Sequence, residues 1–108
     1  MTGGSSAPER VRVIRLLRVR AGMEADFVKS YKDVLARAAR FPGHLGEQLC
    51  RSLDDPAQWL LTSEWDSLEA IQRWRTGPEH RTLVEPMNAC LHDDRWTALF
   101  QVKETVAG

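Results

Sequence analysis

The sequence predicts an α+β domain in which strands and helices follow one another in the order β-α-β-β-α-β. Three observations lead to this class. Apolar and polar residues alternate near both ends and in the middle of the chain, which is typical of strands. In two regions between these segments, apolar residues recur every three to four positions, which is typical of helices. The chain has only 108 residues, so we expect one domain with one core.

The first half of the chain is expected to form a strand, a helix and a second strand. Residues 11–20 (VRVIRLLRVR) are rich in β-branched side chains, and their alternation places Arg15 on the same face as three valines. Residues 22–40 carry an apolar stripe at helical spacing. The segment FPGHLG should end this helix, because proline lacks an N–H donor and glycine frees the backbone. Residues 45–53 then predict the second strand.

A hairpin and a short helix are expected next. Residues 59–65 predict a third strand that pairs with the second across the turn at 54–58 (DDPAQ). Asp66 is followed three positions later by Glu69, which resembles a capping box and predicts the start of a helix.

The remaining chain should supply one more helix and one more strand. Gly77 and Pro78 end the short helix and begin another from 79 to about 85, which Pro86 is expected to interrupt. Residues 95–102 alternate again and predict the last strand. The complete order is that of a ferredoxin-like fold, in which helices cover one face of an antiparallel sheet.

The face of the sheet away from the helices also needs a cover. In the first strand Ile14 and Leu16 alternate with Val13 and Leu17, so that strand is apolar on both sides. One layer of helices hides only one of these sides. We therefore expect a homodimer in which two subunits pack sheet to sheet.

Composition narrows the class of partner and ligand. Basic and acidic residues balance at 15 each, without a long run of one sign, so neither nucleic acid nor an anionic membrane is an expected partner. The ligand should be small and not highly charged. No apolar run is long enough for a membrane span, and MTGGSSAPER lacks the apolar region of a signal peptide, so we expect a cytoplasmic protein. The expected organisation is a disordered segment at 1–10, a domain at 11–103 and a tail at 104–108.

Neither a metal nor a cofactor is expected. Cys50 and Cys90 form no CxxC motif and should be reduced, mostly buried thiols. No histidine pair has metal-ligand spacing, and His44 and His92 have no recognisable partner. Motifs of the types GxGxxG, GxxxxGK[ST] and GxSxG are missing from the sequence. An enzyme with this sequence should work with side chains alone.

Arg15 is the most unusual residue of the first strand. A guanidinium on an apolar, helix-covered face is expensive unless something pairs with it. One interpretation is an ion pair with a core-facing acid such as Glu47 or Glu64, or a strand bulge that turns Arg15 outward. The other is that Arg15 points into a pocket and holds a phenolate, enolate or carbonyl of a ligand.

Two tryptophans and a histidine are further candidates for a site. Trp65 shares strand parity with Trp59 and Leu61, whereas Trp74 lies on a helical stripe and His80 on the next one. Each of these side chains could simply belong to the core. Alternatively, a tryptophan offers an aromatic wall and one N–H donor, which suits a planar polyphenol.

The segments FPGHLG, SEWDSLEAIQRW and GPEHR resemble the antibiotic biosynthesis monooxygenase family over about residues 11–102. The resemblance implies a dimeric α+β barrel and an oxygenase that uses O2, without metal or flavin, to convert an anthrone-type aromatic polyketide to a quinone. On this resemblance Trp65 matches a pocket tryptophan, Arg15 replaces a polar residue of the first strand, and His80 is the nearest acid or base. The following residues are expected to bind the substrate: Trp74, Tyr31, Phe27, Leu61 and Met87.

Leu61 departs from the pattern of the family. The anthrone oxygenases that the chain resembles commonly carry an asparagine four residues before the tryptophan, and leucine cannot donate to an oxyanion. Arg15 or a tryptophan indole could substitute, or the protein could be a polyketide cyclase or a non-catalytic binding protein. Trp74 also resembles the tryptophan of the haem-degrading branch, but the accompanying asparagine and histidine are Arg15 and Val84 here, which argues against haem degradation.

Overall fold

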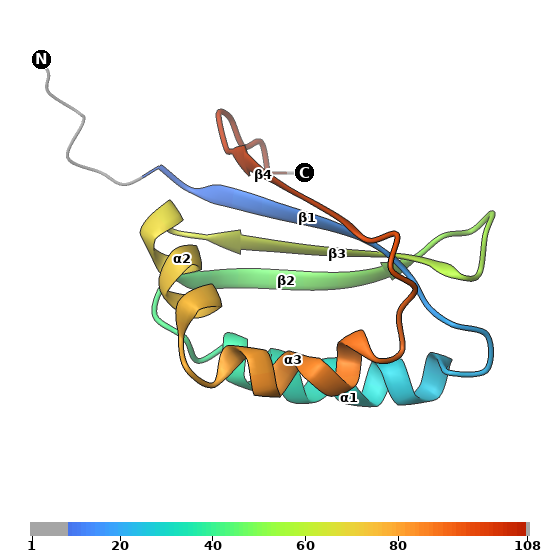
Figure 1. Cartoon of the computed structure of the whole chain (residues 1–108). Helices are drawn as coiled ribbons and strands as arrows, with labels where there is room; N and C mark the ends of the chain where they lie inside the picture. Colours follow the sequence, from blue (N-terminus) through green and yellow to red (C-terminus); the bar gives the residue numbers. More distant parts are fainter. Residues whose placement is uncertain (1–8, 108) are drawn as a thin grey trace, which may run out of the picture.

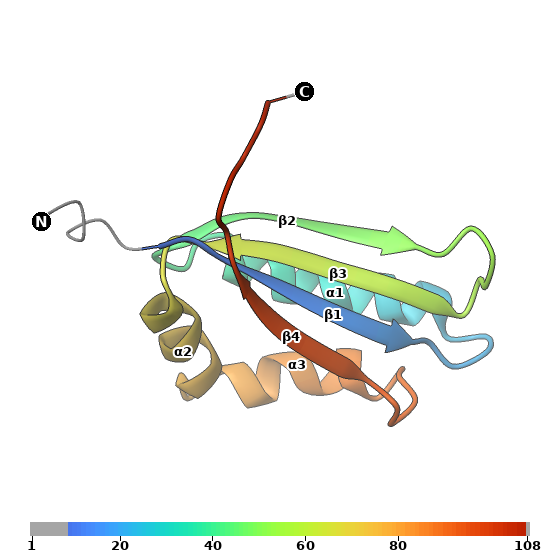
Figure 2. The same cartoon turned by 90° about the horizontal axis from the view of Figure 1, so that it is seen from above.

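The computed structural model describes residues 9–107 and has the predicted ferredoxin-like α+β fold (Figure 1). The elements are β1 (Val11–Arg18), α1 (Glu24–Ala38), β2 (His44–Arg51), β3 (Gln58–Trp65), α2 (Leu68–Thr76), α3 (His80–Asn88) and β4 (Trp96–Gln101). The antiparallel sheet has the order β2-β3-β1-β4, and the helices cover one of its faces (Figure 2). The predicted disordered segment lies outside the described residues except for Glu9 and Arg10, and residues 104–107 have no regular structure.

Strand alternation decides what faces the helices. In β1 the side chains of Val11, Val13 and Leu17 are buried, and Arg15 points to the same side. Arg15 lies between Leu61 of β3 and Thr97 of β4 in the sheet register. The predicted parity of β1 and β3 is therefore confirmed, and the outward bulge at Arg15 is not formed.

A bulge does occur in β2, where the register with β3 shifts between His44 and Gly46. Residues three apart in a regular strand point to opposite faces. Because of the bulge, His44 opposes Trp65 and Glu47 opposes Ser63, so both side chains turn toward the helices. The histidine that was expected to have no partner therefore has one, as described below.

The start of α2 differs from the prediction by one residue. Ser67, not Asp66, is the N-cap, and its hydroxyl accepts a hydrogen bond from the amide of Ala70 at 3.2 Å. Asp66 instead accepts a hydrogen bond from the Ser67 hydroxyl. The loop between α1 and β2 approaches the first turn of α2 closely at Gly43, which has φ +99° and where an added Cβ would lie 2.5 Å from the Cβ of Ala70. Only glycine fits this position.

Helix α3 continues through Pro86 to Asn88, so the predicted interruption is wrong. Proline removes the hydrogen bond to the carbonyl four residues earlier, which here belongs to Thr82. Thr82 is exposed, so water can satisfy that carbonyl at little cost. The consequence is that one more turn of helix, including Met87 and Asn88, faces the sheet.

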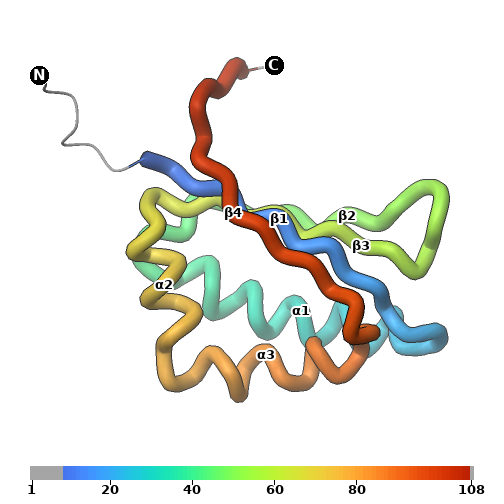
Figure 3. The backbone as a smooth tube through the Cα atoms, turned by 45° about the horizontal axis from the view of Figure 1, so that its top comes forward, coloured from blue at the N-terminus to red at the C-terminus, as the bar shows by residue number. Residues whose placement is uncertain are grey.

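The face of the sheet away from the helices remains uncovered within one subunit (Figure 3). It carries Trp96 and Phe100, whose residues are 51% and 52% exposed. Cys50, also exposed, lies on the same side of the edge strand β2, so the expectation of two mostly buried thiols holds only for Cys90. Both cysteines are free. Within residues 9–107, no helix has the length and apolarity that a membrane span requires.

Candidate functional site

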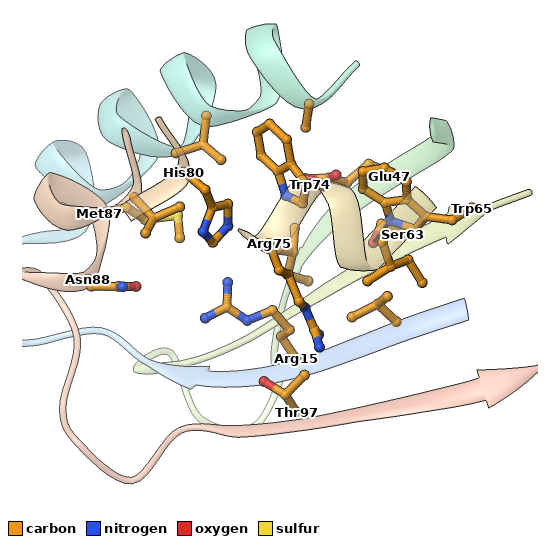
Figure 4. A pocket seen from close by; sticks show the side chains of 16 residues that line it. Arg15, Glu47, Ser63, Trp65, Trp74, Arg75, His80, Met87, Asn88 and Thr97 are labelled. Atoms are coloured by element: carbon orange, nitrogen blue, oxygen red, sulfur yellow. Dashed lines mark hydrogen bonds between the residues drawn. The ribbon is translucent and has the colours of Figure 1, made fainter. Parts of the chain in front are cut away.

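A pocket of about 390 Å³ lies between the inner face of the sheet and the three helices α1, α2 and α3 (Figure 4). It receives side chains from every strand, because the inner-face positions of β1, β2, β3 and β4 meet there. The residues that line it are Val13, Arg15, Val34, Ala38, Glu47, Leu61, Ser63, Trp65, Ile71, Trp74, Arg75, His80, Val84, Met87, Asn88 and Thr97.

Tryptophans form an aromatic wall on one side of the pocket. The ring centroids of Trp65 and Trp74 are 6.3 Å apart at an interplanar angle of 32°. Phe41, which is not among the lining residues, packs edge-on against both rings. The buried Trp65 indole donates its N–H to the Ser63 hydroxyl at 3.1 Å. The indole proton is thus already used, and the Ser63 O–H becomes the free donor at this wall.

Arg15 enters the pocket without an acidic partner. Glu64 lies on the outer face of the sheet and binds Arg12 at 2.6 Å and Arg10 at 2.9 Å, so it is not the core-facing acid that the sequence suggested. Glu47 faces inward but is bound to His44, and no ion pair reaches Arg15 from any of residues 9–107. Burial, followed by the charges of Arg95 and Arg75, lowers the pKa of Arg15 from its ordinary value. Such a guanidinium would be stabilised by an anionic or strongly accepting ligand.

His80 begins α3 and contacts the aromatic wall, with its ring 5.1 Å from that of Trp74 in an edge-on arrangement. Figure 4 shows the Arg15 guanidinium directed toward the imidazole. Burial, and then the charges of Arg15 and Arg75, lower the pKa of His80 below its ordinary 6.5. The imidazole is therefore neutral at pH 7, so it has a lone pair with which to accept a proton.

The pair of His44 and Glu47 was not predicted, because only the bulge in β2 brings the two side chains together. Their side chains are only 5% and 7% exposed, and Nε2 of His44 lies 3.0 Å from Oε1 of Glu47. The His44 ring also packs edge-on against Trp65 at 5.0 Å. Glu47 reaches the pocket. Burial, and then the neighbouring Glu47, raise the pKa of Tyr31. The pair of His44 and Glu47 therefore packs against the aromatic wall at Trp65.

Six of the eight predicted site residues line the pocket: Arg15, Leu61, Trp65, Trp74, His80 and Met87. Phe27 and Tyr31 do not; they lie in the adjoining core cluster, where Phe27 packs edge-on against Trp59 at 5.3 Å.

Five polar lining residues were not predicted as site residues: Glu47, which the sequence suggested only as an ion-pair partner of Arg15, and Ser63, Arg75, Asn88 and Thr97. Ser63 could have been identified because it has the same strand parity as Trp65. Asn88 was missed because the helix was predicted to end before Pro86, whereas α3 continues to Asn88. Across residues 9–107 no three acidic, histidine or cysteine side chains are grouped to hold a metal ion.

Comparison with known proteins gives concordant results. The model of the family described as antibiotic biosynthesis monooxygenase matches residues 10–86. The 42.8 kDa protein in the whiE locus of Streptomyces coelicolor is 41% identical over 99 residues, which cover 92% of this chain and 25% of that protein. Protein SchA of Streptomyces halstedii is 38% identical over 102 residues, which cover 92% and 27%. The chain thus spans about a quarter of the length of these curated relatives.

Among solved structures, SnoaB, a cofactor-independent oxygenase from Streptomyces nogalater, superposes with a TM-score of 0.82. The match covers 93% of this chain and 99% of SnoaB at 21% identity, so it supports the fold alone. The family match extends over most of the domain, from the start of β1 into α3. The chain therefore belongs to the antibiotic biosynthesis monooxygenase family.

Proposed function

We propose that this protein is a cofactor-independent monooxygenase that uses O2 to oxidise an aromatic polyketide intermediate of the anthrone or phenol type, in antibiotic or pigment biosynthesis. Membership of the monooxygenase family supports the reaction class. The observation that carries the proposal is an unpaired guanidinium, that of Arg15, directed toward the imidazole of His80 beside a wall of two tryptophans (Figure 4). A planar, ionisable ring fits such a pocket.

The reaction requires a proton acceptor and a group that stabilises negative charge. The neutral His80 imidazole can remove a proton from the methylene carbon of an anthrone, and the Arg15 guanidinium can stabilise the charge that spreads to a ring oxygen. The anion then gives one electron to O2, and the ring radical and superoxide recombine to a hydroperoxide after protonation. Loss of water, with the second methylene proton, leaves a carbonyl group. The balance is CH2 plus O2 to C=O plus H2O.

The test is oxygen consumption with dithranol, a dihydroxyanthrone, in the presence of a chelator and without added cofactor. We expect O2 uptake and quinone absorbance to rise well above the spontaneous rate. The control is an equal concentration of serum albumin, which binds aromatic compounds without a dedicated site. Binding of dithranol without acceleration would contradict the oxygenase proposal and favour a cyclase or a non-catalytic binding protein.

We also propose that two copies of the chain pair through the uncovered face of the sheet. The exposed Trp96 and Phe100 lie there beside the half-buried Ile14 and Leu16. Burial of this surface would stabilise a dimer through the hydrophobic effect. Light scattering should give twice the chain mass of 12.3 kDa, and Trp96→Glu should lower it toward the monomer. A wild-type monomer at micromolar concentration would contradict this pairing.

A further inference from the structure

We infer that the hydroxyl group of Ser63, held in place by the indole of Trp65, donates a hydrogen bond to an oxygen atom of the bound ligand. Ser63 and Trp65 then act as one unit, in which the serine touches the ligand and the indole N–H orients the serine. The inference rests on the proposed function and deepens it, because it assigns a second donor to the pocket besides Arg15.

The first step of the argument is the hydrogen bonding of Ser63. Its Oγ atom accepts a hydrogen bond from the Trp65 indole N–H at 3.1 Å. A serine hydroxyl also carries one proton of its own to donate. In the part of the chain that the structure describes, no acceptor binds this proton. Because an unpaired buried donor leaves its desolvation uncompensated, a ligand acceptor in the pocket would stabilise this hydroxyl.

The second step is the access of a ligand to this side chain. Strand β3 lies between β1 and β2, so the backbone of Ser63 is covered by paired strands on both sides. The residue nevertheless remains 8% exposed, and it lines the pocket. Figure 4 shows Ser63 beside the Trp65 ring, on the side of the cavity formed by the sheet. The accessible surface of Ser63 therefore opens into the pocket.

The third step is the fixed orientation of the donor. The Trp65 ring is held edge-on by Phe41 at 6.3 Å and by His44 at 5.0 Å, so its N–H has a fixed direction. Acceptance of this N–H occupies one lone pair of the serine oxygen, which limits the directions that the serine proton can take. A hydroxyl that accepts a hydrogen bond also becomes a stronger donor. Such an oriented donor stabilises developing negative charge with little reorganisation.

The fourth step is the position of Ser63 relative to Arg15. In the register of β1 and β3, Ser63 lies opposite Val13, whereas Arg15 lies opposite Leu61. Residues in such a diagonal relation are about 7–8 Å apart. Val13 and Leu61 carry no polar side-chain atom, so the cation and the hydroxyl are two separate donors on the floor of the pocket. A ring ligand with two oxygen atoms can meet both donors at once.

Glu47 is an alternative acceptor for the Ser63 proton, because it lies opposite Ser63 in the register of β2 and β3. Its Oε1 atom is 3.0 Å from Nε2 of His44, and it forms no hydrogen bond with Ser63. A bond to Glu47 would give Ser63 a purely structural role. Removal of the hydroxyl would then change stability alone, whereas a donor to the ligand must also change the ionisation of the ligand.

The experiment measures the ionisation of a bound phenol, so that it does not depend on turnover. The probe is 2-hydroxyanthraquinone, whose visible absorbance changes on ionisation and whose negative charge spreads to a ring carbonyl, so a donor at either oxygen makes it more acidic. Wild-type protein should increase the acid dissociation constant of the probe. Ser63→Ala should lower that constant about tenfold relative to wild type. Thr62→Val, which removes a hydroxyl from the outer face of β3, should not change it.

A double variant tests whether the two residues act as one unit. Trp65→Phe keeps an aromatic ring but removes the N–H that holds the hydroxyl, so it should lower the acid dissociation constant of the probe by less than Ser63→Ala does. In the Ser63→Ala background, Trp65→Phe should have no further effect, because no hydroxyl is left to orient. A combined effect equal to the product of the two single effects would show that the residues act independently.

Several results would overturn the donor role of Ser63. These are failure of the wild type to bind the probe, and an unchanged acid dissociation constant in Ser63→Ala, with or without a loss of stability. If alanine disturbs folding, Ser63→Cys keeps the side-chain shape but donates only weakly, so it should shift the constant in the same direction. Oxidation of dithranol without an effect at Ser63 would reject only this inference. An effect at Ser63 without dithranol oxidation would reject only the oxygenase.

Discussion

The layer between the sheet and the helices has two halves that use the same strands but are filled differently. In the packed half, side chains such as Leu17, Phe27 and Leu91 are almost completely inaccessible. In the pocket half, a cavity of about 390 Å³ remains among the following residues: Arg15, Ser63, Trp65, Trp74 and His80. Both halves contain an inward-facing tryptophan of β3, so residue type alone does not decide which half stays open.

The helices make the difference. Helices α1 and α3 run beside each other beneath the sheet and close the packed half, where Trp59 meets Phe27 at 5.3 Å (Figure 1). Helix α2 lies at the other end and turns into α3 at residues 77–79. Trp65 there meets Trp74 only at 6.3 Å. The pocket therefore lies where residues of all three helices, such as Val34 and Trp74, face the inner side of the sheet, and strand alternation supplies the lining residues that come from the sheet.

The largest expected effect is a difference in the free energy of unfolding between variants of the packed half and variants of the pocket half. Phe27→Ala should lower the free energy of unfolding by about 3–5 kcal/mol, because it leaves a cavity in a fully buried cluster. Trp74→Ala removes a larger side chain but borders a space that already exists, so we expect a loss below about 2 kcal/mol. Urea unfolding of both variants measures the difference. Equal losses would mean that the pocket half is as tightly packed as the core.

The second largest effect is expected for Arg15→Leu, which should lower the activity and raise the stability of the protein. Arg15→Leu should slow dithranol oxidation at least tenfold, because the stabilising cation is lost. The same change should raise the free energy of unfolding by about 1 kcal/mol, because leucine does not incur the desolvation of an unpaired guanidinium. Rates and urea midpoints are measured on the same preparation.

The matched control for Arg15 is Arg73→Leu, on the exposed side of α2. It removes the same charge from the chain without altering the pocket lining, so both the rate and the urea midpoint should stay close to wild type. A full rate in Arg15→Leu would show that the oxyanion is stabilised elsewhere. A loss of stability would show that Arg15 has a structural partner in solution.

Short-range patterns in the sequence were sufficient for the fold and for part of the site. Alternation placed Arg15 and Trp65 on the inner face, since side-chain direction in a strand follows directly from position. Helical spacing similarly aligned His80 with Met87. The composition, balanced overall, gave no sign that Arg15 and Arg75 would both line one pocket, because total charge says nothing about local charge.

The remaining features of the site depend on irregularities of the fold that no periodic pattern in the sequence predicts. The shift in β2 that brings His44 to Glu47 is an irregularity of strand pairing, and it overrides alternation. Helix α3 continues past Pro86 because the freed carbonyl is on the exposed side, a fact of tertiary position. Phe27 and Tyr31 were assigned to the pocket because a helical stripe does not reveal which of its turns meet the packed half.

The smallest expected effect concerns the protonation of His80. Burial, together with Arg15 and Arg75, holds its pKa below the ordinary 6.5, so the unfolded chain binds more protons than the folded chain in the window between the two values. The free energy of unfolding should therefore fall as the pH drops below about 6.5. His80→Gln removes this contribution, so its melting temperature relative to wild type should be higher at pH 5 than at pH 8.

The same residue connects stability with the reaction. If His80 is the base, the rate of dithranol oxidation should fall at acidic pH as the imidazole becomes protonated, and His80→Gln should remove that part of the profile. Arg15→Leu eliminates one of the charges that lower the pKa of His80, so the acidic limb should move to higher pH in that variant. A profile unchanged by His80→Gln would exclude His80 as the base. A limb that stays in place in Arg15→Leu would mean that the two side chains do not interact as Figure 4 shows.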